Sequence, residues 1–221
     1  MTNMRRDATM KETYEALKEK VIAGSQADTK VLVQKLLDAG EPAKRIIDES
    51  LIPAMDIVGD KFQKNEFFIP ELLVAARAME GCLKILQPLL VAGDIKPTGV
   101  FMVGTVKGDL HDIGKNIVAA MMKGAGFEII DLGIDVAPEK FAQAICDKKP
   151  DVIGLSALLT TSMKSMKDTI EEIKKKGVRD KVKIVVGGAP LTQAYADEIG
   201  ADAYGRDAAD AVKISKQLIG K

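Results

Sequence analysis

The stretch GVFMVGTVKGDLHDIGKN, residues 99–116, decides the fold. It begins with a short apolar run, Gly99 to Val103, which is typical of a buried strand. A loop with several glycines follows, and from about Asp112 to Gly124 the spacing of apolar residues becomes helical. A buried strand, a glycine-containing loop and a helix in this order predict the first unit of an α/β domain.

The same alternation continues to the end of the chain. Apolar runs predict further strands at 128–132, 152–156, 183–186 and, more weakly, 203–204. Helical patterns lie at about 138–148, 162–176, 192–199 and 208–218. Strict alternation predicts right-handed crossovers and a parallel sheet with helices on both faces. For five strands we expect the doubly wound, flavodoxin-like or Rossmann-like order 2-1-3-4-5.

The N-terminal part of the chain shows helical periodicity throughout and no strand pattern. One helix is expected to be capped by Asp28 and to direct Val31 inward, and a second to be bent or divided at Pro53. After a loop from Gly59 to Phe68, Pro70 suits the start of a last helix. We therefore predict a four-helix-type bundle.

A change of composition marks the boundary between the two parts. Residues 93–98 combine glycine, proline and charged side chains, and the pattern changes there from helical to alternating. The sequence thus predicts a helical domain over residues 1–92, a linker over 93–98 and an α/β domain over 99–221.

Composition excludes several classes of function. Lys plus Arg and Asp plus Glu both number 32, and no segment has the basic face that nucleic-acid binding needs. No apolar run approaches the ~20 residues that span a bilayer, and the N-terminus does not resemble a signal peptide. Cys82 and Cys146 lie far apart and outside any metal-ligand spacing. We expect a cytoplasmic protein with no nucleic-acid or membrane partner.

The predicted topology places the binding site at one edge of the sheet. In doubly wound sheets ligands bind outside the carboxyl ends of the strands, near the point where strand order reverses. Three loops with unusual residues would meet there, namely Gly104 to Asn116, Leu155 to Ser162 and Gly187 to Pro190.

His111 is the only histidine in the chain, and Asp109 and Asp112 flank it. A lone histidine is most often a surface or helix-capping residue. A zinc or iron site built by protein ligands needs three or four of them, and these loops offer no second His or Cys. A metal carried in a macrocycle needs only one ligand from the protein. Asp109 could then hold the other ring nitrogen, and Ser162 could extend the pair into a proton-linked relay.

The glycines of these loops are less informative. Neither GxGxxG nor the P-loop pattern is present, so a nucleotide site is not favoured. The pair Gly187 and Gly188 is typical of a strand-to-helix turn. It could also open a slot for a long ligand tail, and both interpretations stay open.

Together these residues resemble the cobalamin-binding module of methionine synthase and, in size and layout, the stand-alone corrinoid proteins of methanogenic and acetogenic methyltransferase systems. The Asp-x-His-x-x-Gly, Ser-x-Leu and Gly-Gly elements of that family occur in order, as Asp109, His111 and Gly114, as Ser156 and Leu158, and as Gly187 and Gly188. The resemblance covers nearly the whole chain, because the family has a helical cap domain with segments similar to 58–62 and 68–72.

The resemblance implies cobalamin with its dimethylbenzimidazole tail removed from cobalt and His111 bound in its place. Asp109 and Ser162 would complete the ligand relay, while Ser156 and Thr160 would contact the tail in its cleft. The implied cofactor-binding residues are Asp109, His111, Asp112, Ile113, Gly114, Ser156, Leu158, Thr160, Gly187, Gly188, Phe62, Ile69 and Leu72. The last three match cap positions over the upper, methyl-bearing face. Ordinary packing between domains is nearly as good an explanation for each of them and is compatible with the first.

The implied function is that of a methyl carrier without catalysis of its own. It would accept a methyl group on cobalt from a substrate:corrinoid methyltransferase and deliver it to a methylcorrinoid:acceptor methyltransferase, with tetrahydrofolate or a thiol as acceptor. A reductive activase is a further implied partner. The cap would swing away about residues 93–97 to expose the methyl group. The donor could be methanol, a methylamine, a methoxylated aromatic or a betaine, and the sequence does not select one.

Three other classes share parts of this pattern. A cobalamin-binding sensor normally adds a DNA-binding domain, and a mutase small subunit lacks a cap of this type. A signalling receiver has the same strand order but needs an aspartate at the end of the third strand, where this chain has Leu155 and Ser156. The methyl carrier is therefore the favoured interpretation.

Overall fold

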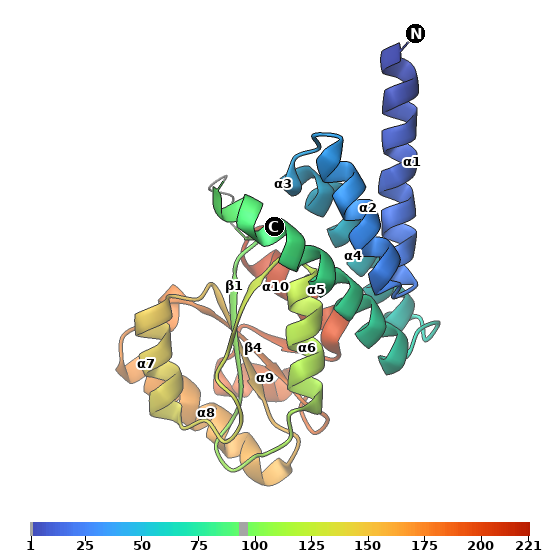
Figure 1. Cartoon of the computed structure of the whole chain (residues 1–221). Coiled ribbons are helices and arrows are strands. Elements are labelled where there is room, and N and C mark those ends of the chain that lie inside the picture. The colour runs from blue at the N-terminus through green and yellow to red at the C-terminus, as the bar shows by residue number, and fades with distance from the viewer. Residues whose placement is uncertain (1, 93–96) are drawn as a thin grey trace. The chain divides into compact units, whose positions relative to one another are not determined.

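The computed structural model describes residues 2–92 and 97–221, and the chain forms two compact units (Figure 1). The helical unit comprises the chain up to Lys96 together with Lys123–Gly126, and the α/β unit comprises the rest. Most of the linker predicted at 93–98 lies outside the described residues.

The helical unit consists of four helical rods. Its elements are α1 (Thr2–Ile22), α2 (Gln26–Asp38), α3 (Ala43–Ile46), a π-helical turn (Ile47–Leu51), α4 (Ile52–Gln63) and α5 (Ile69–Ala92). The π-helical turn and the two helices beside it follow one another without a break, and Pro53 is the second residue of α4, close to the predicted division. A proline lacks an N–H group and its ring crowds the preceding turn, which a wider turn accommodates. The four-helix-type bundle is thus confirmed.

Helix α2 corrects two details of the prediction. Ser25, and not Asp28, occupies the N-cap position, and Asp28 lies in the first turn, where it accepts a hydrogen bond from the Ser25 hydroxyl at 2.9 Å. Val31 is 68% exposed, whereas Val33 and Leu36 are buried. The buried face of the helix contains Thr29, Val33 and Leu36. It is therefore a different face from the predicted one, which included Val31.

The loop predicted over 59–68 is also shorter than expected. Helix α4 continues through Gln63, and Gly59 is a buried residue inside it. The glycine that suggested a turn therefore lies in a packed stretch of helix. No helix within residues 2–92 or 97–221 is both long enough and apolar enough to cross a membrane.

The α/β unit contains a five-stranded parallel sheet. Its strands are β1 (Val100–Thr105), β2 (Glu128–Asp131), β3 (Val152–Ser156), β4 (Lys183–Gly187) and β5 (Ala203–Gly205), and they lie in the order β2-β1-β3-β4-β5. The helices are α6 (Ile113–Gly124), α7 (Pro138–Lys148), α8 (Thr160–Lys175), α9 (Gln193–Ile199) and α10 (Ala208–Leu218), with a 3-10 turn at Arg179–Lys181. The predicted fold class and strand order are confirmed.

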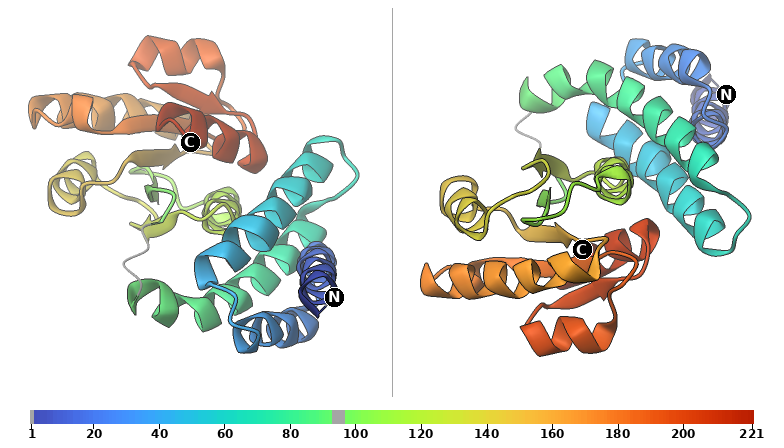
Figure 2. Two further views of the ribbon diagram at one scale, coloured as in Figure 1. Left: turned by 90° about the horizontal axis from the view of Figure 1, so that it is seen from above. Right: turned by 90° about the horizontal axis from the view of Figure 1, so that it is seen from below.

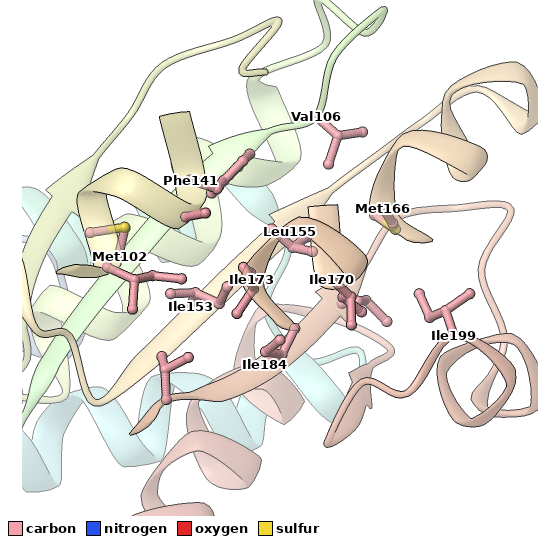
Figure 3. Packing of buried hydrophobic residues seen from close by; sticks show 14 of the residues in the cluster. Met102, Val106, Phe141, Ile153, Leu155, Met166, Ile170, Ile173, Ile184 and Ile199 are labelled. Atoms are coloured by element: carbon pink, nitrogen blue, oxygen red, sulfur yellow. The ribbon is translucent and has the colours of Figure 1, made fainter. Parts of the chain in front are cut away.

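Both faces of the sheet are covered, as Figure 2 shows, with α7, α8 and α9 on one side and α6 and α10 on the other. A buried hydrophobic cluster lies on the first side and is drawn in Figure 3; it includes Met102, Phe141, Ile153, Leu155, Met166, Ile170, Ile173 and Ile184. Because strand residues alternate between faces, Phe101 and Val103 point to the second side. With both faces buried, the strand ends are the accessible part of the sheet.

The register brings the carboxyl ends of the strands together. Thr105 of β1 pairs with Ser156 of β3, and Ser156 pairs with Gly187 of β4. The loops after β1, β3 and β4 therefore begin side by side, as the predicted order requires.

Candidate functional site

The loop after β1 is folded back onto its own strand. The buried hydroxyl of Thr105 donates a hydrogen bond to the backbone carbonyl of His111 at 2.9 Å. Gly108 has a φ of 82°, a left-handed conformation that side-chain-bearing residues rarely adopt. The turn at Gly108 and the anchor at Thr105 hold His111 at the end of the strand.

Asp109 is the centre of the hydrogen-bond network. Its side chain is completely buried, and its Oδ1 accepts from the His111 backbone N–H at 3.0 Å and lies 2.7 Å from His111 Nδ1. Its Oδ2 accepts from Ser162 Oγ at 2.7 Å. The backbone N–H groups of Leu158 and Leu159 also donate to Oδ2, at 2.7 and 3.2 Å. The loop after β3 and the first turn of α8 thus hold the loop after β1.

This network keeps Asp109 ionised. Burial raises the pKa of the carboxyl, but hydrogen bonds from the His111 backbone, the Ser162 hydroxyl and the Leu158 backbone outweigh burial and hold the pKa well below its usual range. A carboxylate accepts hydrogen bonds and cannot donate them, so the proton of a neutral His111 ring resides on Nδ1. Nε2 is then the nitrogen with a free lone pair, and the arrangement is that of a carboxylate-oriented metal ligand.

The side chain of His111 is 50% exposed, and the segments that follow the carboxyl ends of β1, β2 and β3 carry an apolar rim. We use this term for five exposed side chains in the loops after β1, β2 and β3 and at the first residue of α6, which are Leu110, Ile113, Ile134, Leu158 and Leu159. Their exposed fractions run from 42% to 73%. Clustered exposed apolar side chains mark a binding surface more often than they occur by chance. An exposed imidazole at the same edge of the sheet as such a rim suits a broad ligand that brings its own metal.

Two other predicted residues of this loop have open surroundings. Asp112 is exposed and accepts a hydrogen bond from the Asn116 amide at 3.1 Å. Gly114 is exposed as well, and a side chain added there would meet no atom within 4 Å. The structure therefore leaves His111, Asp112, Ile113 and Gly114 exposed at the end of this loop.

The ends of β3 and β4 carry the other predicted residues. Ser156 is partly buried and Thr160 is exposed as the first residue of α8. Gly188 has a φ of 144°, and a Cβ there would stand 1.8 Å from the carbonyl oxygen of Ala157. Close backbone packing thus accounts for Gly188. That Gly187 and Gly188 line a tunnel stays a prediction.

The three predicted residues of the helical unit differ in accessibility. Phe62 is partly buried in α4, Ile69 is 44% exposed at the start of α5, and Leu72 is fully buried. Their contact with a cofactor stays a prediction.

Sequence reasoning missed three groups of site residues. Leu110, Ile134 and Leu159 belong to the apolar rim, and apolar residues inside polar loops are the signal that could have identified them. Lys115 is only 3% exposed, and its Nζ lies 2.5 Å from Asp131 at the end of β2. Asp135 contacts the loop after β1 from the loop after β2. The contacts of Lys115 and Asp135 are long-range, and no local pattern indicates them.

Comparisons with known proteins agree with this geometry. Residues 99–213 match the B12 binding domain family, and residues 13–87 match a second family of the same description. Dimethylamine corrinoid protein 2 of Methanosarcina acetivorans is 41% identical over 213 residues, which cover 96% of this chain and 98% of that protein.

Two solved structures are similar over most of the chain. A cobalamin-binding protein from Desulfitobacterium hafniense has 31% identity and a TM-score of 0.79, with 93% of this chain and 98% of that chain covered. The methanol:cobalamin methyltransferase complex MtaBC from Methanosarcina barkeri has a chain with 28% identity and a TM-score of 0.85, with 95% and 80% covered. With its two B12 binding domains and these relatives, the chain belongs to the cobalamin-binding corrinoid proteins of methyltransferase systems.

Proposed function

We propose that this chain carries methyl groups between methyltransferases on a cobalamin whose lower axial ligand is His111. The observation that carries the proposal is the contact between the buried Asp109 carboxylate and His111 Nδ1 at 2.7 Å. The contact leaves Nε2 as the ligating atom and fixes the orientation of the ring. A carboxylate that accepts a hydrogen bond from the other ring nitrogen raises the basicity of a metal-bound imidazole. Bound cobalamin supplies the methyl-transfer chemistry, and the protein supplies ligation, orientation and shielding.

The residues around His111 fit such a cofactor. The dimethylbenzimidazole base is proposed to be displaced from cobalt, and one imidazole is the single ligand that the protein has to provide. The five side chains of the apolar rim offer a surface for a large ring. A side chain added at Gly108 or Gly114 would meet no atom within 4 Å apart from its chain neighbours, so both positions leave space beside the loop.

The same proposal assigns roles to the other predicted residues. Ser156 and Thr160, at the end of β3 and the start of α8, contact the displaced nucleotide tail, and Gly187 and Gly188 border its path. Phe62, Ile69 and Leu72 of the helical unit are proposed to shield the upper face. The hinge predicted at residues 93–97 lies mostly outside the described residues.

The partners follow from the same role. A carrier needs one methyltransferase that loads the methyl group and a second that removes it to tetrahydrofolate or a thiol. Since oxidised corrinoid has to be returned to its reactive state, a reductive activase is a third partner. Relatives of similar identity are named for dimethylamine and trimethylamine, and a structural neighbour belongs to a methanol system. These three donors form the first screen for the loading enzyme.

The first test is cofactor retention. Wild type and His111→Ala are incubated with hydroxocobalamin and desalted, and their ultraviolet–visible spectra are recorded. We expect one cobalamin per wild-type chain with an axial-imidazole spectrum, and a changed spectrum or loss of cofactor in the variant. Asp151→Asn, at the opposite end of β1, serves as control and should match wild type. Absence of retained cobalamin in wild type, or identical spectra for wild type and His111→Ala, refutes the proposal.

A further inference from the structure

The loop after β2 extends the pairing with Thr105, the last residue of β1, and with Val106 after it. The N–H of Thr105 donates to the carbonyl of Gly133 at 3.0 Å, and the N–H of Val136 donates to the carbonyl of Thr105 at 2.9 Å. Val106 and Val136 form a parallel bridge. The segment Gly133–Val136 therefore lies against the start of the loop that carries His111.

Asp135 makes two hydrogen bonds to that loop. Its backbone N–H donates to the carbonyl of Asp109 at 3.1 Å, and its Oδ1 accepts from the N–H of Gly108 at 2.7 Å. Asp135 itself has a φ of 50°, a left-handed conformation that Asp and Asn tolerate better than most residues. This backbone shape lets the side chain and the N–H of one residue reach two successive residues of the neighbouring loop.

Asp109 is consequently held from both strands that neighbour β1. Leu158, Leu159 and Ser162 hold its carboxylate from the β3 side, whereas Asp135 holds its main chain from the β2 side. If only the carboxylate of Asp109 were held, its backbone could still move by rotation about the side-chain bonds. Because His111 follows two residues later, such a rotation would move the imidazole.

We infer that Asp135 is a positioning residue for His111, acting through the main chain of Gly108 and Asp109. Its importance for cofactor binding rests on the proposed function, whereas its effect on the loop does not. Among Asp135, Gly108 and Asp109, only Asp109 belongs to the signature that carried the resemblance.

Three variants separate positioning from general stability. Asp135→Gly retains access to the left-handed conformation and removes the acceptor of the Gly108 N–H. Asp135→Asn keeps a side-chain oxygen and tolerates the same φ. Asp151→Gly is the matched control, because Asp151 holds Val100 in the same way at the opposite end of β1. Its Oδ2 accepts from the Val100 N–H at 2.7 Å and its own N–H donates to the Val100 carbonyl at 3.0 Å.

The first readout uses the full chain without cofactor. His111 is the only histidine, so its ring gives a single set of NMR signals. In Asp135→Gly we expect the ring signals of His111 to broaden. We also expect the backbone amide of His111 to exchange about threefold to tenfold faster, because the loss of one ordinary hydrogen bond corresponds to a factor of this size. Asp135→Asn should resemble wild type. Asp151→Gly should lower the melting temperature comparably and leave the His111 signals unchanged.

Two results would overturn the inference. One is an unchanged His111 exchange rate and ring spectrum in Asp135→Gly, and the other is an equal change in Asp151→Gly. Cofactor release provides the second readout, and we expect Asp135→Gly to lose cobalamin about threefold to tenfold faster than Asp151→Gly. Should wild type retain no cobalamin, the proposed function fails, and the NMR and exchange measurements still decide the role of Asp135.

Discussion

Asp109 Oδ2 and Ser162 Oγ lie 2.7 Å apart in the folded chain, although 53 residues separate them in sequence. Both side chains are buried, and the contact connects the end of β1 with the first turn of α8. The strand order reverses between β1 and β3. The carboxylate that orients His111 follows β1 and is thus held by a hydroxyl from α8, which follows β3.

Ser162→Ala removes this hydroxyl from the carboxylate. We expect a loss of about 1–2 kcal/mol in the free energy of unfolding, because hydrogen bonds to charged groups are stronger than neutral ones and the two backbone donors remain. Urea denaturation measures it. Ser215→Ala is the matched control, since Ser215 Oγ is buried without a hydrogen-bond partner in the described structure. Its removal should change stability by less than about 0.5 kcal/mol. Equal losses in the two variants would contradict a special contact at Ser162.

Asp109→Asn tests the charge itself. We expect a loss of roughly 2–3 kcal/mol at neutral pH, because one carboxylate oxygen that accepts several hydrogen bonds becomes an amide NH₂ that faces donors. Asp112→Asn, on the exposed flank of His111, should cost far less.

The same pair of proteins gives the pH dependence. The pKa of Asp109 is depressed in the folded state, so its contribution is fully present above the ordinary aspartate pKa of about 3.9 and is lost as the pH falls below it. The stability difference between wild type and Asp109→Asn should therefore narrow on acidification from pH 6 to pH 3. A constant difference across this range would show that Asp109 titrates normally.

The ion pair of Lys115 and Asp131 should respond asymmetrically to mutation. Lys115 is 3% exposed, whereas Asp131 is 42% exposed. Asp131→Asn leaves a buried ammonium without its charged partner and should cost about 3 kcal/mol, while Lys115→Met leaves a hydrated carboxylate and should cost about 1 kcal/mol. Thermal unfolding of both variants and of the double variant measures the coupling. A larger loss in Lys115→Met would mean that packing of the lysine stem dominates.

Gly188→Ala tests the close approach of β4 to the loop after β3. The new Cβ would stand 1.8 Å from the Ala157 carbonyl oxygen, so backbone has to move, and we expect a loss of at least about 3 kcal/mol. Gly177→Ala is the control, because Gly177 has a φ of 69° and open space around it; about 1–2 kcal/mol is expected there. Similar melting temperatures for the two variants would refute the steric explanation.

The sequence was most informative where one local pattern determines one element. The five strands, their order and the loops that meet at the carboxyl edge follow from alternation and short connections. The motif around His111 placed Asp109 beside it, and the structure agrees. The wrong expectations concern single residues of helices. Val31 was expected to be buried and is exposed, and Gly59 was expected to begin a loop and lies inside a helix. In both cases tertiary packing, and not the local pattern, determines the outcome.

The contacts of Lys115 and Asp135 could not be predicted for a different reason. Each is a polar residue whose partner lies in a separate element of the structure, so neither periodicity nor spacing identifies it. Asp135 also depends on a left-handed backbone conformation, which is rare for any residue other than glycine and has only a weak sequence signal.

The separation of Asp109 from its donors has a consequence for synthesis on the ribosome. His111 leaves the exit tunnel well before Leu158, Leu159 and Ser162, and β3 has to pair with β1 before these groups can reach the carboxylate. Long-range contacts of this kind form late, because the intervening chain must first be ordered. A nascent chain that ends within α7 therefore carries His111 and Asp109 without the three groups of the β3 side that hold the carboxylate.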